Sequence, residues 1–222
     1  MSEFNLIWRK YGLRANPYFN SPLTIDGGTL PISAFIGREN EQQQLRSAIK
    51  LGGEVRCLIV GDPGVGKTSL VNYVRSQAAK NGFFTPSREI EINRVISGNE
   101  FIILTLSSIF DEIKRRDIQL PEHLHDQLDA FYMLNSYGEN FMEVVNTSQL
   151  NRQKLISLFQ NVVKELVNPR FKGLILHYDN LDNIEDDEGI VDMFSDIRDF
   201  LLTKDIVFFF VGDHYTAPLI PV

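Results

Sequence analysis

The chain has 222 residues, of which 43% are hydrophobic, so it can bury one sizeable core and we expect a single α/β domain. Its formal net charge of −7 argues against a globally basic nucleic-acid-binding protein, although it leaves DNA open as a partner of local basic clusters. The lone Cys57 excludes a disulfide framework and no apolar run approaches membrane-spanning length, so we expect a cytoplasmic protein with no membrane segment.

The first predicted elements lead up to a glycine-rich loop. Residues 1–34 combine Pro, Gly and Asn with several aromatic side chains, which predicts an arm packed on the core rather than a free linker. Residues 35–222 are predicted to form the core domain itself. Within this core, residues 39–51 have the apolar spacing of a helix and residues 55–60 read as a short buried strand.

Residues 61–68 read Gly-Asp-Pro-Gly-Val-Gly-Lys-Thr and fit the phosphate-binding loop pattern G-x-x-x-x-G-K-[ST] at every fixed position. Glycines let such a backbone fold around phosphates, so that consecutive amide groups form an anion-binding nest. Lys67 is expected to reach the β- and γ-phosphates and Thr68 to bind Mg²⁺, whereas Ser69 comes one position too late for the metal. The nucleotide-binding residues expected here are Gly61, Asp62, Pro63, Gly64, Val65, Gly66, Lys67, Thr68 and Ser69.

The remainder of the chain alternates helical patterns with short strands. Strands that are apolar on both faces and separated by helices predict a parallel sheet covered on both sides. We therefore expect an α/β fold with the three-layer α/β/α core of P-loop NTPases and a helical insertion between the second and third core strands. The predicted elements are a helix at 69–81, an edge strand at 88–92, a mostly helical insertion at 93–147, a helix at 148–167, a strand at 173–178, a helix at 188–202 and a strand at 206–211.

Acidic and polar residues follow the third predicted core strand. Asp179 ends it, at the place where a carboxylate holds Mg²⁺ directly or through water, so we predict Asp179 as the second magnesium residue. In ATPases of this architecture the next residue is commonly Glu, which orients the attacking water, but here it is Asn180, whose amide accepts no proton. Asp182 can substitute if the turn brings it back toward the γ-phosphate, and Asp186 and Asp187 are further candidates; the alternative is that all three cap the following helix and favour its N-terminus.

A further polar pair follows the last predicted strand. Asp213 and His214 lie where a side chain on a neighbouring strand can sense the γ-phosphate, and the alternative is that they cap their own loop. Together with the preceding residues, this gives a predicted catalytic set of Lys67, Asp179, Asn180 and Asp182, with Asp213 as an additional nucleotide-binding residue.

Three segments make the chain resemble the AAA+ and STAND class of P-loop ATPases, especially replication-initiator ATPases and related bacterial ATP-binding switch proteins. They are Phe-Ile-Gly-Arg-Glu at 35–39, the loop at 61–68 and Tyr-Asp-Asn-Leu-Asp at 178–182. The resemblance implies ATP and Mg²⁺ as cofactors and places Phe35 and Ile36 beside the adenine. The chain stops soon after the strand at 206–211, so the family's fifth core strand, arginine finger and helical lid have no counterpart, which implies either a fragment or a reduced ATPase.

The leading hypothesis is a magnesium-dependent ATPase that acts as a molecular switch. Binding of ATP or ADP would then alter contacts with a protein partner, a second copy of the chain or DNA. Asn180 motivates the alternative of a binding module that holds a nucleotide without hydrolysing it. A P-loop small-molecule kinase is a third hypothesis, although the sequence shows no arginine-bearing lid.

Overall fold

The structure, a computed structural model, describes residues 10, 21–28, 30–136 and 151–220. Its sheet contains four parallel strands in the order β1-β4-β3-β2, which confirms the predicted α/β core. The strands are β1 (Glu54–Val60), β2 (Ile90–Glu91), β3 (Leu174–Asp179) and β4 (Ile206–Gly212). The helices are α2 (Glu39–Leu51), α3 (Lys67–Lys80), α4 (Gly98–Arg115), α5 (Glu122–Ser136), α7 (Arg152–Leu166), α8 (Asp187–Asp196) and α9 (Arg198–Leu201), with 3-10 turns η1 (Ile32–Ala34), η3 (Leu181–Asn183) and η4 (Ala217–Leu219).

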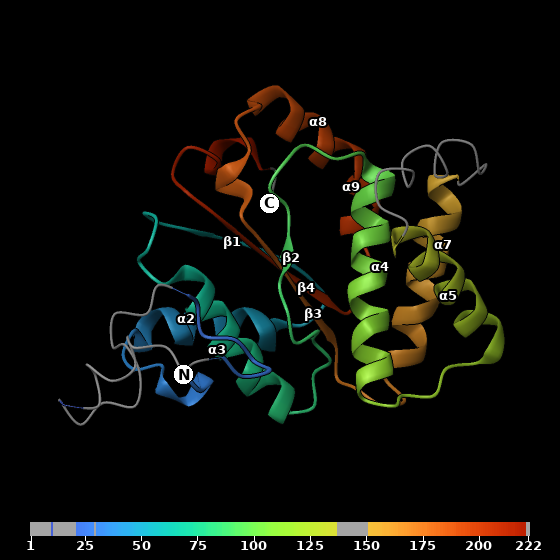
Figure 1. The fold of residues 1–222 in the computed structure, drawn as a ribbon, viewed down its shortest axis with the longest axis horizontal. Helices are drawn as coiled ribbons and strands as arrows, with labels where there is room; N and C mark the ends of the chain where they lie inside the picture. Colours follow the sequence, from blue (N-terminus) through green and yellow to red (C-terminus); the bar gives the residue numbers. More distant parts are fainter. Residues whose placement is uncertain (1–9, 11–20, 29, 137–150, 221–222) are drawn as a thin grey trace.

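Helices cover both faces of this sheet (Figure 1). On one face, Val71 and Val74 of α3 belong to the same buried cluster as Phe209 of β4. On the other face, Phe208 and Phe210 of β4 belong to a larger cluster with α4, α5 and α7. Successive side chains of a strand point to opposite faces, so the uninterrupted apolar run of β4 supplies both cores.

The chain between β2 and β3 is helical over most of its described length and supports the strand that ends at Asp179. Phe101 of α4 stacks on Tyr178 with ring centroids 4.7 Å apart. The Thr105 Oγ1 and Tyr178 hydroxyl oxygens lie 2.8 Å apart in a buried hydrogen bond. The predicted helical insertion is therefore present in the described residues, and it packs directly against the penultimate residue of β3.

Two predicted elements have different bounds in the structure. The helix predicted at 188–202 is interrupted at Ile197, which separates α8 from α9. The strand predicted at 88–92 contains only Ile90 and Glu91. One physical reason lies in the preceding segment, because the guanidinium of Arg75 donates to the carbonyl oxygens of Pro86 and Arg88, the latter at 3.3 Å. These carbonyls bind a side chain instead of a neighbouring strand.

The described part of the N-terminal segment contacts α3 and the approach to β2. The Leu23 N–H donates to Ser69 Oγ at 3.0 Å, and Asn72 Nδ2 donates to the Leu23 carbonyl oxygen at 3.0 Å. Asp26 lies 3.3 Å from Arg88 in an exposed ion pair. Most of the arm predicted at 1–34, together with residues 148–150 of a predicted helix, lies outside the described residues.

Three consecutive basic residues, 114–116, lie at the end of α4 and pair with acidic side chains. Lys114 Nζ lies 2.7 Å from Asp129 Oδ1, and Arg115 and Arg116 both form ion pairs with Glu112. These side chains therefore neutralise acidic neighbours.

None of the helices in the described ranges has the length and apolar character needed to cross a bilayer.

Candidate functional site

The phosphate-binding loop (residues 61–68) connects β1 to α3 at the carboxyl edge of the sheet. Gly64 has φ +77° and Gly66 has φ +87°, a left-handed conformation that favours glycine. The φ of Gly61 is not positive, so of the three glycines only Gly64 and Gly66 supply this conformational freedom. Arg38 closes the loop from outside, because its Nη2 donates to the Val65 carbonyl oxygen at 2.6 Å.

Lys67 begins α3 and is 7% exposed. Its Nζ donates to the carbonyl oxygens of Gly61 at 2.8 Å and Asp62 at 3.2 Å. The same ammonium group lies 3.8 Å from Asp182 Oδ2. The turn after β3 therefore brings Asp182 back to the loop lysine.

Thr68 and Asp179 meet directly, although 111 positions separate them in the sequence. Thr68 Oγ1 donates to Asp179 Oδ2 at 2.7 Å, and the Asn180 N–H donates to Asp179 Oδ1 at 3.0 Å. Burial raises the pKa of Asp179 above its ordinary value, outweighing the hydrogen bonds from Thr68 and Asn180, which lower it. A cation beside this carboxylate would compensate for the burial of its charge.

The donor set around Asp179 fits magnesium, which prefers oxygen ligands and keeps several water molecules. A hydroxyl and a carboxylate are present together, and phosphate oxygens of a nucleotide would add further ligands. Within residues 30–136 and 151–220 and the shorter described stretches, no group of three or more His, Cys, Asp or Glu side chains could hold a metal ion.

A cavity of about 590 Å³ lies between the loop, the end of β3 and β2. Lys67, Thr68, Asp179 and Asn180 are among its lining residues, so the structure brings the main predicted site residues together. Four of the lining side chains are carboxylates, against a single lysine, and they are Glu89, Glu91, Asp179 and Asp182.

Glu89 and Glu91 are the site residues that the sequence analysis missed. Their alternation with Ile90 and Ile92 indicated an edge strand. The sequence feature that could have identified them as site residues was that such a strand could end beside Asp179. The parallel ladder does pair Glu91 with Asp179. To find these two residues from the sequence, one would have had to know that β2 lies next to β3 in the sheet.

Three other predicted residues are Ser69, Phe35 and Ile36, and only the first of them lines this cavity. Ser69 lines it, but its Oγ accepts a hydrogen bond from the Leu23 N–H. Phe35 stacks on Tyr73 with ring centroids 5.0 Å apart, and Ile36 is 90% exposed. Neither Phe35 nor Ile36 is among the residues lining the cavity.

Asp213 caps the turn that follows β4. Its Oδ1 accepts from the N–H groups of Tyr215 at 2.9 Å and Thr216 at 2.8 Å. The backbone hydrogen bond from Thr216 is the main cause of a pKa below the ordinary value, and the charge of Lys67 adds a smaller effect. The contacts match the loop-capping alternative, while His214 lines a separate cavity beside the loop.

Asp186 and Asp187 lie at the start of α8. Asp186 is the N-cap of α8, with its Oδ1 accepting from the Gly189 N–H at 2.9 Å, and Asp187 lies in the first turn. Asp182 differs from them, because it lies in η3 and faces Lys67. The turn itself begins at Asn180, which lines the cavity with φ +67°.

The comparisons with known proteins agree with this geometry. A family profile described as the AAA ATPase domain matches residues 34–196, which include the loop, β2, β3 and the turn after β3. Searches of curated proteins and of solved structures find no significant match. The profile covers well over half of the chain, and the chain therefore belongs to the AAA ATPase domain family.

Proposed function

We propose that this protein binds ATP with Mg²⁺, hydrolyses it and acts as a molecular switch. The observation that carries the proposal is the contact between Thr68 Oγ1 and Asp179 Oδ2 at 2.7 Å, beside a lysine of the phosphate-binding loop. This contact joins the two halves of a nucleotide site across 111 positions of sequence. The family match supports ATP as the nucleotide.

The proposed roles follow from the chemistry of each side chain. Lys67 would bind the β- and γ-phosphates, and the amide groups of the loop would bind the phosphate oxygens. Thr68 would bind magnesium directly and Asp179 directly or through water. Magnesium would neutralise charge on the phosphates.

The switch part of the proposal rests on the turns that border the cavity. Asn180 and Asp182 belong to one such turn and lie next to the place proposed for the metal. A γ-phosphate that orders this turn would transmit the nucleotide state to its surface neighbours, as in other nucleotide switches. We propose a protein partner or a second copy as the reader of this state, in line with the resemblance to switch ATPases.

A second candidate function is a module that holds ATP without hydrolysing it. Asn180 favours it, because its amide can orient water but cannot accept a proton. The two functions differ in one measurable property, the release of phosphate from bound ATP.

The test is magnesium-dependent binding and hydrolysis of ATP by the wild-type chain, Lys67→Ala and Asn180→Glu. We expect binding and phosphate release in the wild type and loss of both in Lys67→Ala. An increase of turnover in Asn180→Glu would show that water activation limits the rate. Equal binding by Lys67→Ala and the wild type would reject the site, and tight binding without turnover would favour the second candidate.

A further inference from the structure

The proposed site needs a group that takes a proton from the attacking water. The residue after Asp179 is Asn180, which cannot do so. Of the four carboxylates that line the cavity, Asp179 is bound by Thr68 and Asp182 lies 3.8 Å from the ammonium group of Lys67. The two carboxylates that remain, Glu89 and Glu91, both come from the region of β2.

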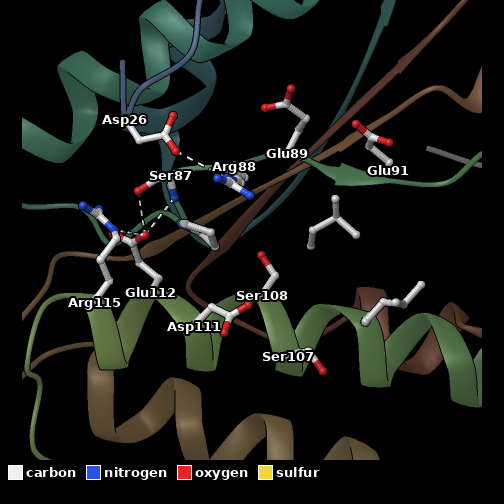
Figure 2. A pocket seen from close by; sticks show the side chains of 13 residues that line it. Asp26, Ser87, Arg88, Glu89, Glu91, Ser107, Ser108, Asp111, Glu112 and Arg115 are labelled. Atoms are coloured by element: carbon white, nitrogen blue, oxygen red, sulfur yellow. Dashed lines mark hydrogen bonds and ion pairs between the residues drawn. The ribbon is translucent and has the colours of Figure 1, made fainter. Parts of the chain in front are cut away.

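Glu91 stands beside Asp179 at the end of the neighbouring strand. The parallel ladder pairs the two residues, and the Ile92 N–H donates to the Asp179 carbonyl oxygen at 2.9 Å. Partners in adjacent parallel strands lie about 4.8 Å apart and direct their side chains to the same face. Ile90 points the other way, into the core with α4. Figure 2 shows the carboxylates of Glu89 and Glu91 directed away from α4.

The surroundings of Glu89 and Glu91 differ. Glu89 is half-buried and accepts a weak hydrogen bond from Asn72 Nδ2 at 3.4 Å. Burial of Asp179 is the largest cause of its raised pKa, and the negative charge of Glu89 raises that pKa further. Glu91 is exposed, is the last residue of β2 and lines the cavity that holds Lys67 and Thr68. Water that enters this cavity can therefore reach Glu91.

We propose that Glu91 is the catalytic carboxylate that orients and deprotonates the attacking water. The proposal rests on the ATPase function proposed above and assigns the missing proton acceptor to a neighbouring strand. The water oxygen forms a bond to the γ-phosphorus, and the bond from that phosphorus to the β–γ bridging oxygen breaks. The electron pair of the broken bond stays on ADP, and Glu91 accepts the proton of the water. The products are ADP and inorganic phosphate.

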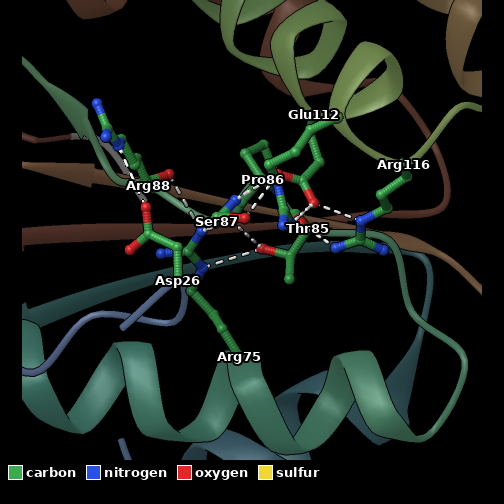
Figure 3. Close-up of polar contacts among 9 residues, drawn as sticks. Asp26, Arg75, Thr85, Pro86, Ser87, Arg88, Glu112 and Arg116 are labelled. Carbon is green, nitrogen blue, oxygen red and sulfur yellow. Dashed lines mark hydrogen bonds and ion pairs between the residues drawn. The ribbon is translucent and has the colours of Figure 1, made fainter. Parts of the chain in front are cut away.

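A clamp between α3 and α4 fixes the approach to Glu91 (Figure 3). From α3, Arg75 Nε donates to Thr85 Oγ1 at 3.0 Å. From α4, Glu112 Oε2 accepts from the Ser87 N–H at 3.0 Å and from the Ser87 hydroxyl at 2.7 Å. Because β2 has only two residues, these contacts on residues 85–88 supply the positional order that a longer strand would give. Arg75 and Glu112 thus hold the segment that leads to Glu91.

The experiment compares kcat and MgATP affinity in Glu91→Gln, Glu89→Gln and the control Glu54→Gln. Glu54 is also an exposed glutamate on a strand, but at the start of β1, remote from the cavity. We expect Glu91→Gln to lower kcat by about 100-fold or more, the usual effect of removing a general base. Its MgATP Kd should stay within about threefold of the wild type, a change well below 1.4 kcal/mol. Glu54→Gln should change neither quantity.

A double variant tests whether a carboxylate at another position can replace that of Glu91. In Glu91→Gln/Asn180→Glu, a carboxylate returns at the position after Asp179, and we expect part of the lost turnover to return. The proposal is overturned if Glu91→Gln keeps kcat within about threefold of the wild type, if Glu89→Gln alone abolishes turnover, or if the wild type binds MgATP without hydrolysing it. A wild type that does not bind MgATP would instead refute the proposed function itself, so the two failures are distinguishable.

Discussion

The phosphate-binding loop lines the same cavity as residues of segment 85–91, which contains β2 and the residues before it. The two segments differ in the contacts that hold them in place. Within the loop, Lys67 Nζ binds carbonyl oxygens only five and six positions earlier, and Arg38 adds a contact from α2's N-cap to the Val65 carbonyl oxygen. Residues 85–88 are instead held by Arg75 of α3 and by Glu112 of α4, which is 25 positions from Ser87. The conformation of the loop thus depends largely on residues close in the sequence, whereas the position of β2 depends on packing between helices.

The largest expected effect comes from removing the α3 half of the clamp. Arg75 is fully buried, and burial lowers its pKa to about 10, against the charges of Glu89, Glu112 and Asp179 that raise it. Replacing it in Arg75→Met leaves buried oxygens without donors, and we expect a loss of about 3–5 kcal/mol in the free energy of unfolding. Urea unfolding measures this loss.

The matched control for this change is Arg46→Met. Arg46 Nη2 donates to Gln42 Oε1 within α2, a hydrogen bond that involves none of residues 85–88. We expect a change within about 0.5 kcal/mol there. Equal stability of the two variants would contradict the dependence of β2 on the clamp.

The α4 half of the clamp gives a smaller, pH-dependent effect. Burial alone would raise the pKa of Glu112, but hydrogen bonds from Arg115, Ser87 and Arg116 outweigh it and hold that pKa below its ordinary value. We expect Glu112→Gln to lower the free energy of unfolding by about 2 kcal/mol at neutral pH, because hydrogen bonds to a charged group are lost.

The sign of the pH dependence follows from the lowered pKa of Glu112. Its contribution to stability is present above the ordinary value of 4.5 and is lost as pH falls through the folded-state value. The stability difference between Glu112→Gln and the wild type should therefore shrink in acid. A difference that stays constant from neutral pH to pH 3, measured by urea unfolding, would show that the carboxylate charge is not what holds Ser87.

Within the loop, substitutions should act through local backbone conformation. Gly66 has φ +87° and no atom within 4 Å of an added Cβ, so the cost of Gly66→Ala is conformational, about 1–2 kcal/mol. Gly61→Ala is the matched control, because its φ is ordinary and its Cβ would meet Val65 Cγ2 at 3.4 Å, a normal contact. In thermal unfolding, Gly61→Ala should have a higher melting temperature than Gly66→Ala. The reverse order would contradict the loop geometry.

The smallest expected effect is that of Asp179→Asn, which should stabilise the folded protein instead of destabilising it. Burial raises the pKa of Asp179, so without magnesium its negative charge destabilises the folded protein as pH rises through that pKa. We expect Asp179→Asn to raise the melting temperature of the metal-free protein at neutral pH and to lose magnesium-dependent hydrolysis. The gain should shrink as pH falls toward the ordinary value of 3.8, because the folded protein and the unfolded chain then both bind the proton of this carboxyl. A lower melting temperature in Asp179→Asn at neutral pH would contradict this electrostatic interpretation.

The sequence predicted the fold and the loop side of the site because their signals are local. The apolar runs of the strands, the helical periodicities and the pattern at 61–68 each lie within a short window. Thr68 and Asp179 could be paired because each follows a strand. The role of Glu91 could not be predicted, because it depends on the sheet order and on the contacts of Arg75 and Glu112 that set where β2 begins.

The most direct test of the central claim is a calorimetric titration of the wild-type chain and Lys67→Ala with ATP, with and without magnesium. Four carboxylates face one lysine in the cavity, so free ATP should be repelled and MgATP should bind. We predict a saturating isotherm for the wild type only when magnesium is present, and none for Lys67→Ala. Binding of equal strength without magnesium, or in Lys67→Ala, would contradict the proposed nucleotide site.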